Sequence, residues 1–342
     1  VAMTSLPQSL PVSRRARPCR KTMSRRGLFK TDGTSPPSYR THANYELTNK
    51  RTRMSQHFKM VLRDGRQLAW REYGKGFPIV FAHGNLNSSL LEPAWQKTAR
   101  QAENAGARVL ALDRPGYGLT SPHTNRTYLD FAQDVQELIN HLSISKFGVV
   151  GYSSGGPHAL SCVAAQLPGL TTCSLVSSDA PYHKLGLNQR MYGASEVTME
   201  HALSKAEENY QAMVASYQTM KKRDRVPIAL ADINHAILNG FEGAASDSVL
   251  EASESWGFEL EDIKTNEDKP TLNIWHGSED HDVPIEAGTY MIEQLMGSDR
   301  GNGSKHRCHI IEGENHTLIR RHWESILLEA VAGGGSGGEG KL

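Results

Sequence analysis

The stretch of sequence that decides the fold is GYSSGG, residues 151–156. It follows an apolar run at 147–150, which predicts a buried strand, and it leads into small and apolar residues that predict a helix. The pattern G-x-S-x-G between a strand and a helix places its serine on a tight, strained turn above a sheet. Gly151 and Gly155 carry no side chain that would collide with the backbone of such a turn. Ser153 is therefore the candidate nucleophile.

Short apolar strands alternate with amphipathic helices on both sides of this turn. The expected strands cover residues 57–62, 67–73, 78–82, 108–112, 147–150, 173–176, 272–275 and 309–311. The expected helices cover residues 94–103, 128–142, 157–165, 197–219, 285–295 and 318–331. This alternation predicts an α/β fold with a mostly parallel, doubly wound sheet covered by helices on both faces.

One long insertion interrupts the alternation before the strand at 272–275. Its size and helical stretches predict a helical cap over the carboxyl edge of the sheet. We therefore expect five segments along the chain: a leader at 1–54, a core at 55–181 and 270–332, the cap at 182–269, and a Gly-rich tail at 333–342. The tail has the composition of a flexible linker and is left out of the fold.

The leader differs in charge from the rest of the chain. Residues 1–60 hold thirteen Lys and Arg but two acidic residues, although the formal net charge of the whole chain is only +1. This Ser- and Arg-rich composition is typical of an organelle transit peptide. A disordered tail, or a reading frame extended too far upstream, is an alternative. A nucleic-acid-binding arm is disfavoured because no aromatic residues are interleaved with the basic ones.

Composition excludes several other classes of protein. The chain is 38% hydrophobic and 22% charged, as is usual for globular proteins. No stretch approaches the ~18 consecutive apolar residues of a transmembrane helix. The four scattered cysteines predict buried, reduced thiols rather than a disulfide framework. We expect an intracellular protein, cytoplasmic or in an organelle, without nucleic-acid partners; the oligomeric state is left open.

A serine nucleophile needs a base and an acid that orients the base. Asp280 follows the expected strand 272–275, and His316 follows the expected strand 309–311. Both lie where the loops at the carboxyl ends of parallel strands converge. Asp282 and Asp179 are alternatives for the acid, and His281 is an alternative for the base.

Five motifs in this order resemble the α/β-hydrolase-fold superfamily, in its cap-bearing serine esterase and lipase branch with epoxide-hydrolase-like relatives. The motifs are His83-Gly84-Asn85, Asp113–Gly118 (DRPGYG), Gly151–Gly155, Gly277–Pro284 (GSEDHDVP) and Gly313–His316 (GENH). The resemblance covers about residues 57–332. It is specific for the fold and the catalytic machinery but not for the substrate.

The resemblance implies a role for each site residue. Ser153 is the nucleophile, His316 the general base and acid, and Asp280 the acid that orients His316; the spacing within the motif favours Asp280 over its alternatives. The backbone N–H groups of Asn85 and Ser154 would form the oxyanion hole. No metal and no cofactor are expected.

Position 153 discriminates between the branches of the superfamily. Related epoxide hydrolases and haloalkane dehalogenases carry Asp at this turn, so Ser153 favours an acyl-enzyme, although the Asn85 motif is similar to that of dehalogenases. The implied function is a serine hydrolase of small to medium apolar carboxylic esters. The candidate substrate-binding residues are Leu86, Trp95, Tyr117 and Tyr152. The alternatives are a small-molecule receptor on the same scaffold and a cofactor-free peroxidase or C–C hydrolase with the same triad.

Overall fold

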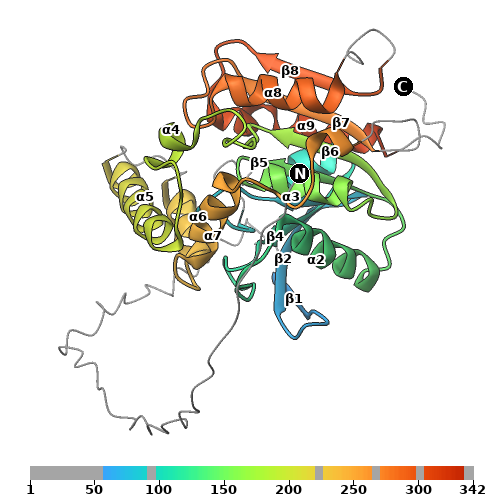
Figure 1. Cartoon of the computed structure of the whole chain (residues 1–342). Coiled ribbons are helices and arrows are strands. Elements are labelled where there is room, and N and C mark those ends of the chain that lie inside the picture. Colours follow the sequence, from blue (N-terminus) through green and yellow to red (C-terminus); the bar gives the residue numbers. More distant parts are fainter. Residues whose placement is uncertain (1–56, 91–97, 220–225, 264–269, 298–303, 335–342) are drawn as a thin grey trace, which may run out of the picture. The chain divides into compact units, whose positions relative to one another are not determined.

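The structure, a computed structural model, describes residues 57–90, 98–219, 226–263, 270–297 and 304–334. The predicted leader at 1–54 and the candidate residue Trp95 lie outside these ranges. Within the described residues, one eight-stranded sheet runs in the order β1-β2-β4-β3-β5-β6-β7-β8 (Figure 1). Its strands are β1 His57–Val61, β2 Gln67–Gly74, β3 Phe77–Ala82, β4 Ala107–Asp113, β5 Phe147–Tyr152, β6 Leu170–Val176, β7 Thr271–Gly277 and β8 Arg307–Ile311.

The sheet is mostly parallel, as the sequence predicts. Strands β1 and β2 pair antiparallel, as expected for a hairpin through the Asp-Gly turn, and β2 pairs antiparallel with β4. Every other pairing between the described strands is parallel. Strand β5, which leads to Ser153, is a central strand with five of its six residues buried. The parallel strands therefore end at one edge of the sheet, and the polar loops gather there.

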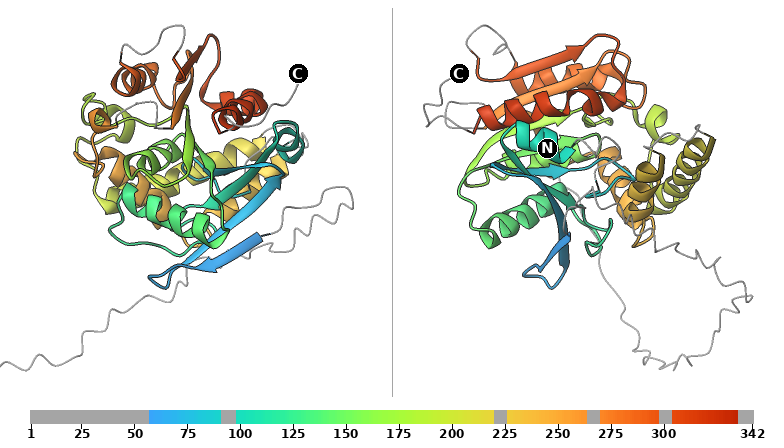
Figure 2. Two further views of the ribbon diagram at one scale, coloured as in Figure 1. Left: turned by 90° about the vertical axis from the view of Figure 1, so that its right-hand side faces the viewer. Right: turned by 180° about the vertical axis from the view of Figure 1, so that it is seen from behind.

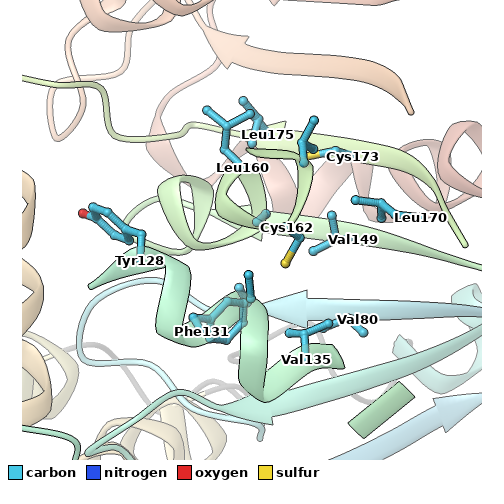
Figure 3. Close-up of a cluster of buried hydrophobic side chains, with 14 of the residues drawn as sticks. Val80, Tyr128, Phe131, Val135, Val149, Leu160, Cys162, Leu170, Cys173 and Leu175 are labelled. Carbon is cyan, nitrogen blue, oxygen red and sulfur yellow. The ribbon is translucent and has the colours of Figure 1, made fainter. Parts of the chain in front are cut away.

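Helices cover both faces of this sheet (Figure 2). Helices α2 (Tyr128–His141), α3 (Gly155–Ala164) and α8 (Ile285–Met296) bury their apolar sides in one core cluster. Figure 3 shows part of it, where Phe131 and Val135 of α2 face Cys162 of α3 and Val149 of β5. Helices α1 (Thr98–Asn104) and α9 (Ile319–Ala332) enclose a second cluster on the other face. Two cores on opposite faces are what a doubly wound sheet requires.

Helix α2 shows how local sequence fixes these elements. Thr127 and Asp130 form a capping box, in which the Thr127 hydroxyl accepts the N–H of Asp130 and the Asp130 carboxylate accepts the N–H of Thr127. This arrangement satisfies backbone donors that the first turn leaves unpaired. The apolar side chains of the helix recur at helical spacing and are buried. Capping and amphipathicity therefore agree on the same helix.

The predicted cap lies between β6 and β7. It contains α4 (Asn188–Tyr192), α5 (Met199–Thr219), α6 (Val226–Ala236), α7 (Glu242–Ala252) and the short 3₁₀ helix η1 (Leu260–Asp262). Side chains of α5, α6 and α7 share one buried cluster with Leu86 and Tyr117, which follow β3 and β4. Gly243 of α7 approaches Gly116 so closely that a Cβ on Gly116 would lie 2.8 Å from its Cα atom. The cap therefore packs on loops at the carboxyl edge of the sheet.

The structure corrects some details of the sequence prediction. Cys308 is exposed, contrary to the prediction of a buried thiol, because it lies on β8, which among the described strands pairs with β7 alone. Cys162 and Cys173 are buried, as predicted. The helix expected at 318–331 is confirmed as α9 to within one residue at each end, and the 3₁₀ helix η2 (His316–Leu318) precedes it. Of the described helices, none is both long enough and apolar enough to cross a membrane.

The core of the sheet makes a prediction about stability. Leu138 of α2 is 0% exposed, whereas Leu328 of α9 is 48% exposed. We expect Leu138→Ala to lower the free energy of unfolding by about 2–5 kcal/mol, because it leaves a cavity in a packed core. Leu328→Ala is the matched control and should change it by less than about 1 kcal/mol. Urea unfolding followed by far-ultraviolet circular dichroism measures both values, and equal losses would contradict the burial of α2.

Candidate active site

Ser153 lies on the turn that joins β5 to α3. Its φ angle is +53°, in the left-handed region that non-glycine residues seldom adopt. Its N–H donates to the carbonyl oxygen of Val176 (3.0 Å), and its own carbonyl accepts the N–H of Gly156 (2.8 Å). A strained residue persists only where its surroundings hold it in place. These two hydrogen bonds join Ser153 to the end of β6 and to the first turn of α3.

The glycines around Ser153 are required by close packing. A Cβ on Gly151 would collide with the carbonyl oxygen of Gly155, and a Cβ on Gly155 would collide with the carbonyl oxygen of Ala82 at the end of β3. A Cβ on Gly84 would lie 3.1 Å from the Cβ of Ser153. The G-x-S-x-G pattern is thus explained by backbone approach, as the sequence analysis predicts.

The three residues expected to form a triad lie in one hydrogen-bonded chain. The Nε2 atom of His316 is 3.1 Å from the Oγ atom of Ser153. The Nδ1 atom of His316 is 2.9 Å from the Oδ2 atom of Asp280 and 3.2 Å from its Oδ1 atom. These contacts fit an imidazole that donates from Nδ1 to the carboxylate and accepts the serine proton at Nε2. The structure therefore brings together Ser153, His316 and Asp280, which are far apart in the sequence.

Backbone contacts hold the acid and the base in position. The Oδ1 atom of Asp280 accepts the N–H groups of Asp282 (3.0 Å) and Val283 (2.8 Å). The carbonyl oxygen of His316 accepts the hydroxyls of Tyr152 (3.3 Å) and Ser177 (3.2 Å). The acid and the base are thus fixed relative to the strands that carry them, which is what preorganised catalytic groups need.

The alternatives for the acid and the base are not part of the hydrogen-bonded chain, although Asp282 has a carboxylate oxygen within 4.8 Å of ligand atoms of Asp280 and His316. Asp282 and His281 are exposed, and neither makes a hydrogen bond to Ser153. Asp179 is buried, but its carboxylate accepts the hydroxyl of Tyr182 rather than the ring of His316. Among the weighed acids, only Asp280 contacts the His316 ring by a hydrogen bond.

The electrostatics of the chain match its geometry. Burial alone would lower the pKa of His316, but the hydrogen bond and the charge of Asp280 outweigh it and raise the pKa above its usual value. Burial alone would raise the pKa of Asp280, but the hydrogen bond and the charge of His316 lower it. Asp280 therefore stays ionised at neutral pH, and His316 becomes a stronger base.

Comparison with known proteins agrees with this geometry. A family model described as the alpha/beta hydrolase fold matches residues 78–319. The chain belongs to the alpha/beta hydrolase fold family. A Synechocystis sp. protein, provisionally named a non-heme chloroperoxidase, is 27% identical over 264 residues, covering 75% of this chain and 91% of that protein.

Two further relatives of this alpha/beta hydrolase carry different names. The non-heme chloroperoxidase CPO-A1 of Kitasatospora aureofaciens is 23% identical over 75% of this chain and 95% of that protein. The solved structure of an esterase from Exiguobacterium antarcticum superposes with a TM-score of 0.59 at 18% identity, covering 80% of this chain and 97% of that one. The esterase structure shows a shared fold, and the named activities of these relatives differ.

In this alpha/beta hydrolase, the residues expected at the oxyanion hole flank Ser153. Ser154 is the N-cap of α3, so its N–H lies at the positive end of the helix dipole. Asn85 follows Gly84, which packs against the Cβ of Ser153. The side chain of Asn85 is held by the carbonyl oxygen of Ala244 in α7 (3.3 Å). The cap thus contacts the loop that carries the expected oxyanion donor.

The expected substrate-binding residues take different positions. The ring of Tyr152 lies 5.2 Å from the ring of His316, centroid to centroid. Leu86 and Tyr117 are buried in the cluster that joins the core to the cap. The Tyr117 hydroxyl donates to Asp247 of α7 (2.6 Å), so its polar end is engaged by the cap. Trp95 lies outside the described residues.

A buried charge cluster beside the site was missed by the sequence analysis. Asp247 of α7 is 0% exposed and forms ion pairs with Arg114 (2.6 Å) and with Arg126. The buried ring of His158 lies 2.8 Å from Arg126 through its Nε2 atom. Burial raises the pKa of Asp247, but the charges of Arg114 and Arg126 outweigh it and hold the pKa below its usual range. The only local signal was Arg114 within the DRPGYG motif, and nothing in the sequence marks Asp247 as its partner.

Two buried carboxyl groups face the Ser154 hydroxyl. Asp179 follows β6 and Glu251 lies on α7, and both are within hydrogen-bonding reach of Ser154. Burial raises the pKa of each group above its usual value, and for Glu251 the charge of Asp179 adds to this effect. Like-charged carboxyls in one buried place cannot both ionise at low cost. Asp179 and Glu251 together therefore carry less negative charge than two ionised carboxylates would.

The Asp247 ion pairs make a prediction about the stability of the packing between the cap and the core. Asp247→Asn removes the charge that balances Arg114 and Arg126, and we expect it to lower the free energy of unfolding by about 3–5 kcal/mol. Glu242→Gln, at an exposed position of the same helix, is the control and should have an effect below about 0.5 kcal/mol. Chemical denaturation of both variants is the measurement. A loss in Asp247→Asn no larger than in the control would contradict a structural role for the pair.

The His316–Asp280 pair predicts the pH dependence of activity. His316 must be neutral to accept a proton, so kcat/KM should rise with pH through a pKa above the usual 6.5 of histidine. In Asp280→Asn the carboxylate no longer fixes the tautomer, and kcat should fall by roughly 10³–10⁴-fold. A pH series of initial rates with an activated ester measures both effects. An inflection below the usual value in the unaltered protein would show that Asp280 does not raise the pKa of His316.

Proposed function

We propose that this protein is a cofactor-free serine hydrolase that cleaves carboxylic esters through an acyl-enzyme. The observation that carries the proposal is the chain from Ser153 Oγ through His316 to Asp280, with distances of 3.1 and 2.9 Å. An alcohol nucleophile, an imidazole base and a buried carboxylate in this order are the equipment for acyl transfer. The fold shared with the esterase from Exiguobacterium antarcticum agrees with this chemistry.

The first half of the reaction forms the acyl-enzyme. His316 Nε2 takes the proton of Ser153 as Oγ attacks the ester carbonyl, and Asp280 stabilises the resulting imidazolium. The carbonyl oxygen becomes an oxyanion, which accepts hydrogen bonds from the N–H groups of Asn85 and Ser154. Each such donor is typically worth about 10²–10³ in rate. His316 then gives the proton to the leaving alcohol as the carbon–oxygen bond breaks.

The second half releases the acid. His316 takes a proton from water, which attacks the carbonyl carbon of the acyl-Ser153. The same oxyanion donors stabilise the second tetrahedral intermediate, and the proton returns to Ser153 as the acid leaves. Related epoxide hydrolases and dehalogenases carry aspartate at this turn, whereas a serine hydroxyl forms an ester with the acyl group of the substrate. Serine at position 153 therefore favours an acyl intermediate.

The proposed substrates are small to medium apolar esters. The ring of Tyr152 lies beside that of His316, and Leu86 and Tyr117 belong to the apolar cluster that joins the core to the cap. The cap carries more acidic than basic residues. A negative cap disfavours anionic substrates by its field. The raised pKa values of Asp179 and Glu251 favour a neutral group near Ser154.

A second candidate activity is supported by the names of two relatives. The proteins from Synechocystis sp. and Kitasatospora aureofaciens are named as non-heme chloroperoxidases. A serine triad can pass its acyl group to hydrogen peroxide instead of water, which yields a peracid that oxidises halide in solution. Halogenation of a chromogenic acceptor in acetate buffer with hydrogen peroxide tests this activity. It should be lost with ester hydrolysis in Ser153→Ala if both reactions use one acyl-enzyme.

The nucleophile makes a prediction that active-site labelling can test. A fluorophosphonate probe should label the unaltered protein covalently, and Ser153→Ala should lose that labelling to background. Ser161→Ala, a buried serine later in the same helix α3, is the control and should keep it. In-gel fluorescence of the three proteins reads the outcome. Undiminished labelling of Ser153→Ala would refute the assignment, and labelling without ester turnover would favour a ligand receptor over a hydrolase.

A further inference from the structure

We propose that His57, Asp113 and His235 form a binding site for a divalent transition-metal ion, such as Zn²⁺, that fastens the cap to the sheet. His57 is the first residue of β1, Asp113 is the last residue of β4, and His235 lies at the end of the cap helix α6. None of the three belongs to the Ser153, His316 and Asp280 group. The site is therefore separate from the proposed chemistry.

The geometry of the three side chains suits a tetrahedral ion. The Nε2 atom of His235 lies 3.1 Å from the Oδ2 atom of Asp113, and the Nε2 atom of His57 lies 3.5 Å from the same oxygen. One ligand atom from each residue lies within 4.8 Å of the other two. Ligands about 2.0–2.1 Å from a tetrahedral zinc lie roughly 3.3–3.4 Å from one another. Two of the three distances between ligand atoms are therefore already close to those of a tetrahedral zinc site.

The donor set selects the kind of ion. Two imidazole nitrogens with one carboxylate oxygen suit Zn²⁺ and its first-row neighbours, whereas Ca²⁺ and Mg²⁺ prefer oxygen ligands alone. The Nε2 atom of His57 is buried and makes no hydrogen bond to another described residue. Its 3.5 Å separation from the carboxylate is too long for a good hydrogen bond. An ion between the three atoms would give this nitrogen a partner.

Outer contacts hold Asp113 in the orientation that a ligand needs. Its Oδ1 atom accepts the N–H of Ser89 (2.8 Å), and its Oδ2 atom accepts the N–H of Leu119 (3.0 Å). Metal-binding carboxylates are usually oriented by hydrogen bonds of this kind. The carboxylate of Asp113 is thus fixed by the core, and the imidazole of His235 comes to it from the cap.

An ion can reach the site from solvent. The side chain of Asp113 is 0% exposed, but those of His57 and His235 are 17% and 12% exposed. Three protein ligands leave the fourth position of a tetrahedral ion for water. Binding would join α6 to β1 and β4, and an ion that binds only the docked cap stabilises it by mass action.

A second group must be distinguished in any test. Atoms of Asp280, Asp282 and His316 also lie within 4.8 Å of one another. An ion there would displace the hydrogen bond between His316 and Asp280 and would inhibit the enzyme. Binding at the proposed site leaves that hydrogen bond intact. Variants of the two groups therefore separate the two locations.

The test is Zn²⁺ binding by isothermal titration calorimetry, on the full chain freed of metal with a chelator. We expect one tight ion per chain, with an affinity that falls at least about 100-fold in His57→Gln and in His235→Gln. His201→Gln, a cap histidine whose ring contacts the carbonyl oxygen of Tyr192, is the control and should bind as tightly as the unaltered protein. Thermal midpoints of all four proteins should rise with Zn²⁺ only where binding is tight.

Cobalt gives a readout that needs no variant. The unaltered protein loaded with Co²⁺ should show the intense visible absorption of a tetrahedral ion bound by nitrogen and oxygen, and Zn²⁺ should remove it by competition. Absence of tight Zn²⁺ binding, or of this spectrum, would overturn the proposal. It would also be overturned if His316→Gln abolished tight binding while His57→Gln and His235→Gln did not, because the ion would then lie at the triad.

Discussion

The tight turn at Ser153 is the constraint on which the rest of the site depends. A positive φ angle at a non-glycine residue costs energy, and the surrounding structure must supply it. Here it comes from the close approach of β5, α3 and the end of β3, which is possible only because Gly151 and Gly155 have no side chains. The turn places the serine hydroxyl above the sheet, with the N-terminus of α3 directly behind it. Nucleophile and oxyanion donor are therefore products of one backbone conformation.

The sheet and the cap complete what the turn begins. Parallel strands β5, β7 and β8 end at one edge, so the loops after them bring Asp280 and His316 to Ser153. The cap approaches the same edge and is joined to the core by a buried ion pair, in which Asp247 of α7 balances Arg114 and Arg126. A buried carboxylate with two guanidinium partners favours one docking position of the cap. If the charges separated while still buried, each would lose the partner that replaces its hydration.

Sequence reasoning succeeded where local pattern carries the information. Apolar runs predicted the strands. The glycines around Ser153 predicted the turn, because close backbone packing requires glycine at those positions. Asp280 and His316 each follow a predicted parallel strand, and this position was enough to predict that both lie at the carboxyl edge of the sheet. Cys308 was misjudged because edge position depends on the order of strands in the sheet. No short stretch of sequence determines the order of the strands in the sheet.

Contacts across the cap could not be predicted in the same way. Asp247 looks like any acidic residue on a polar helix, and its burial depends on how α7 docks against the loop that holds Arg114. The same is true of His57, Asp113 and His235, whose side chains meet only when β1, β4 and α6 come together. Such groups are assembled by tertiary packing from residues with no common spacing. Their partners therefore became visible only in the structure.

The most direct measurement of the central claim is trapping of the covalent intermediate. The protein is mixed with p-nitrophenyl acetate, quenched in acid after a short time, digested, and analysed by peptide mass spectrometry. The account predicts an acetyl group on Ser153 that appears with the release of nitrophenol and decays as water attacks. Rapid ester hydrolysis with no acetyl group on Ser153, or with the group on another residue, would contradict it.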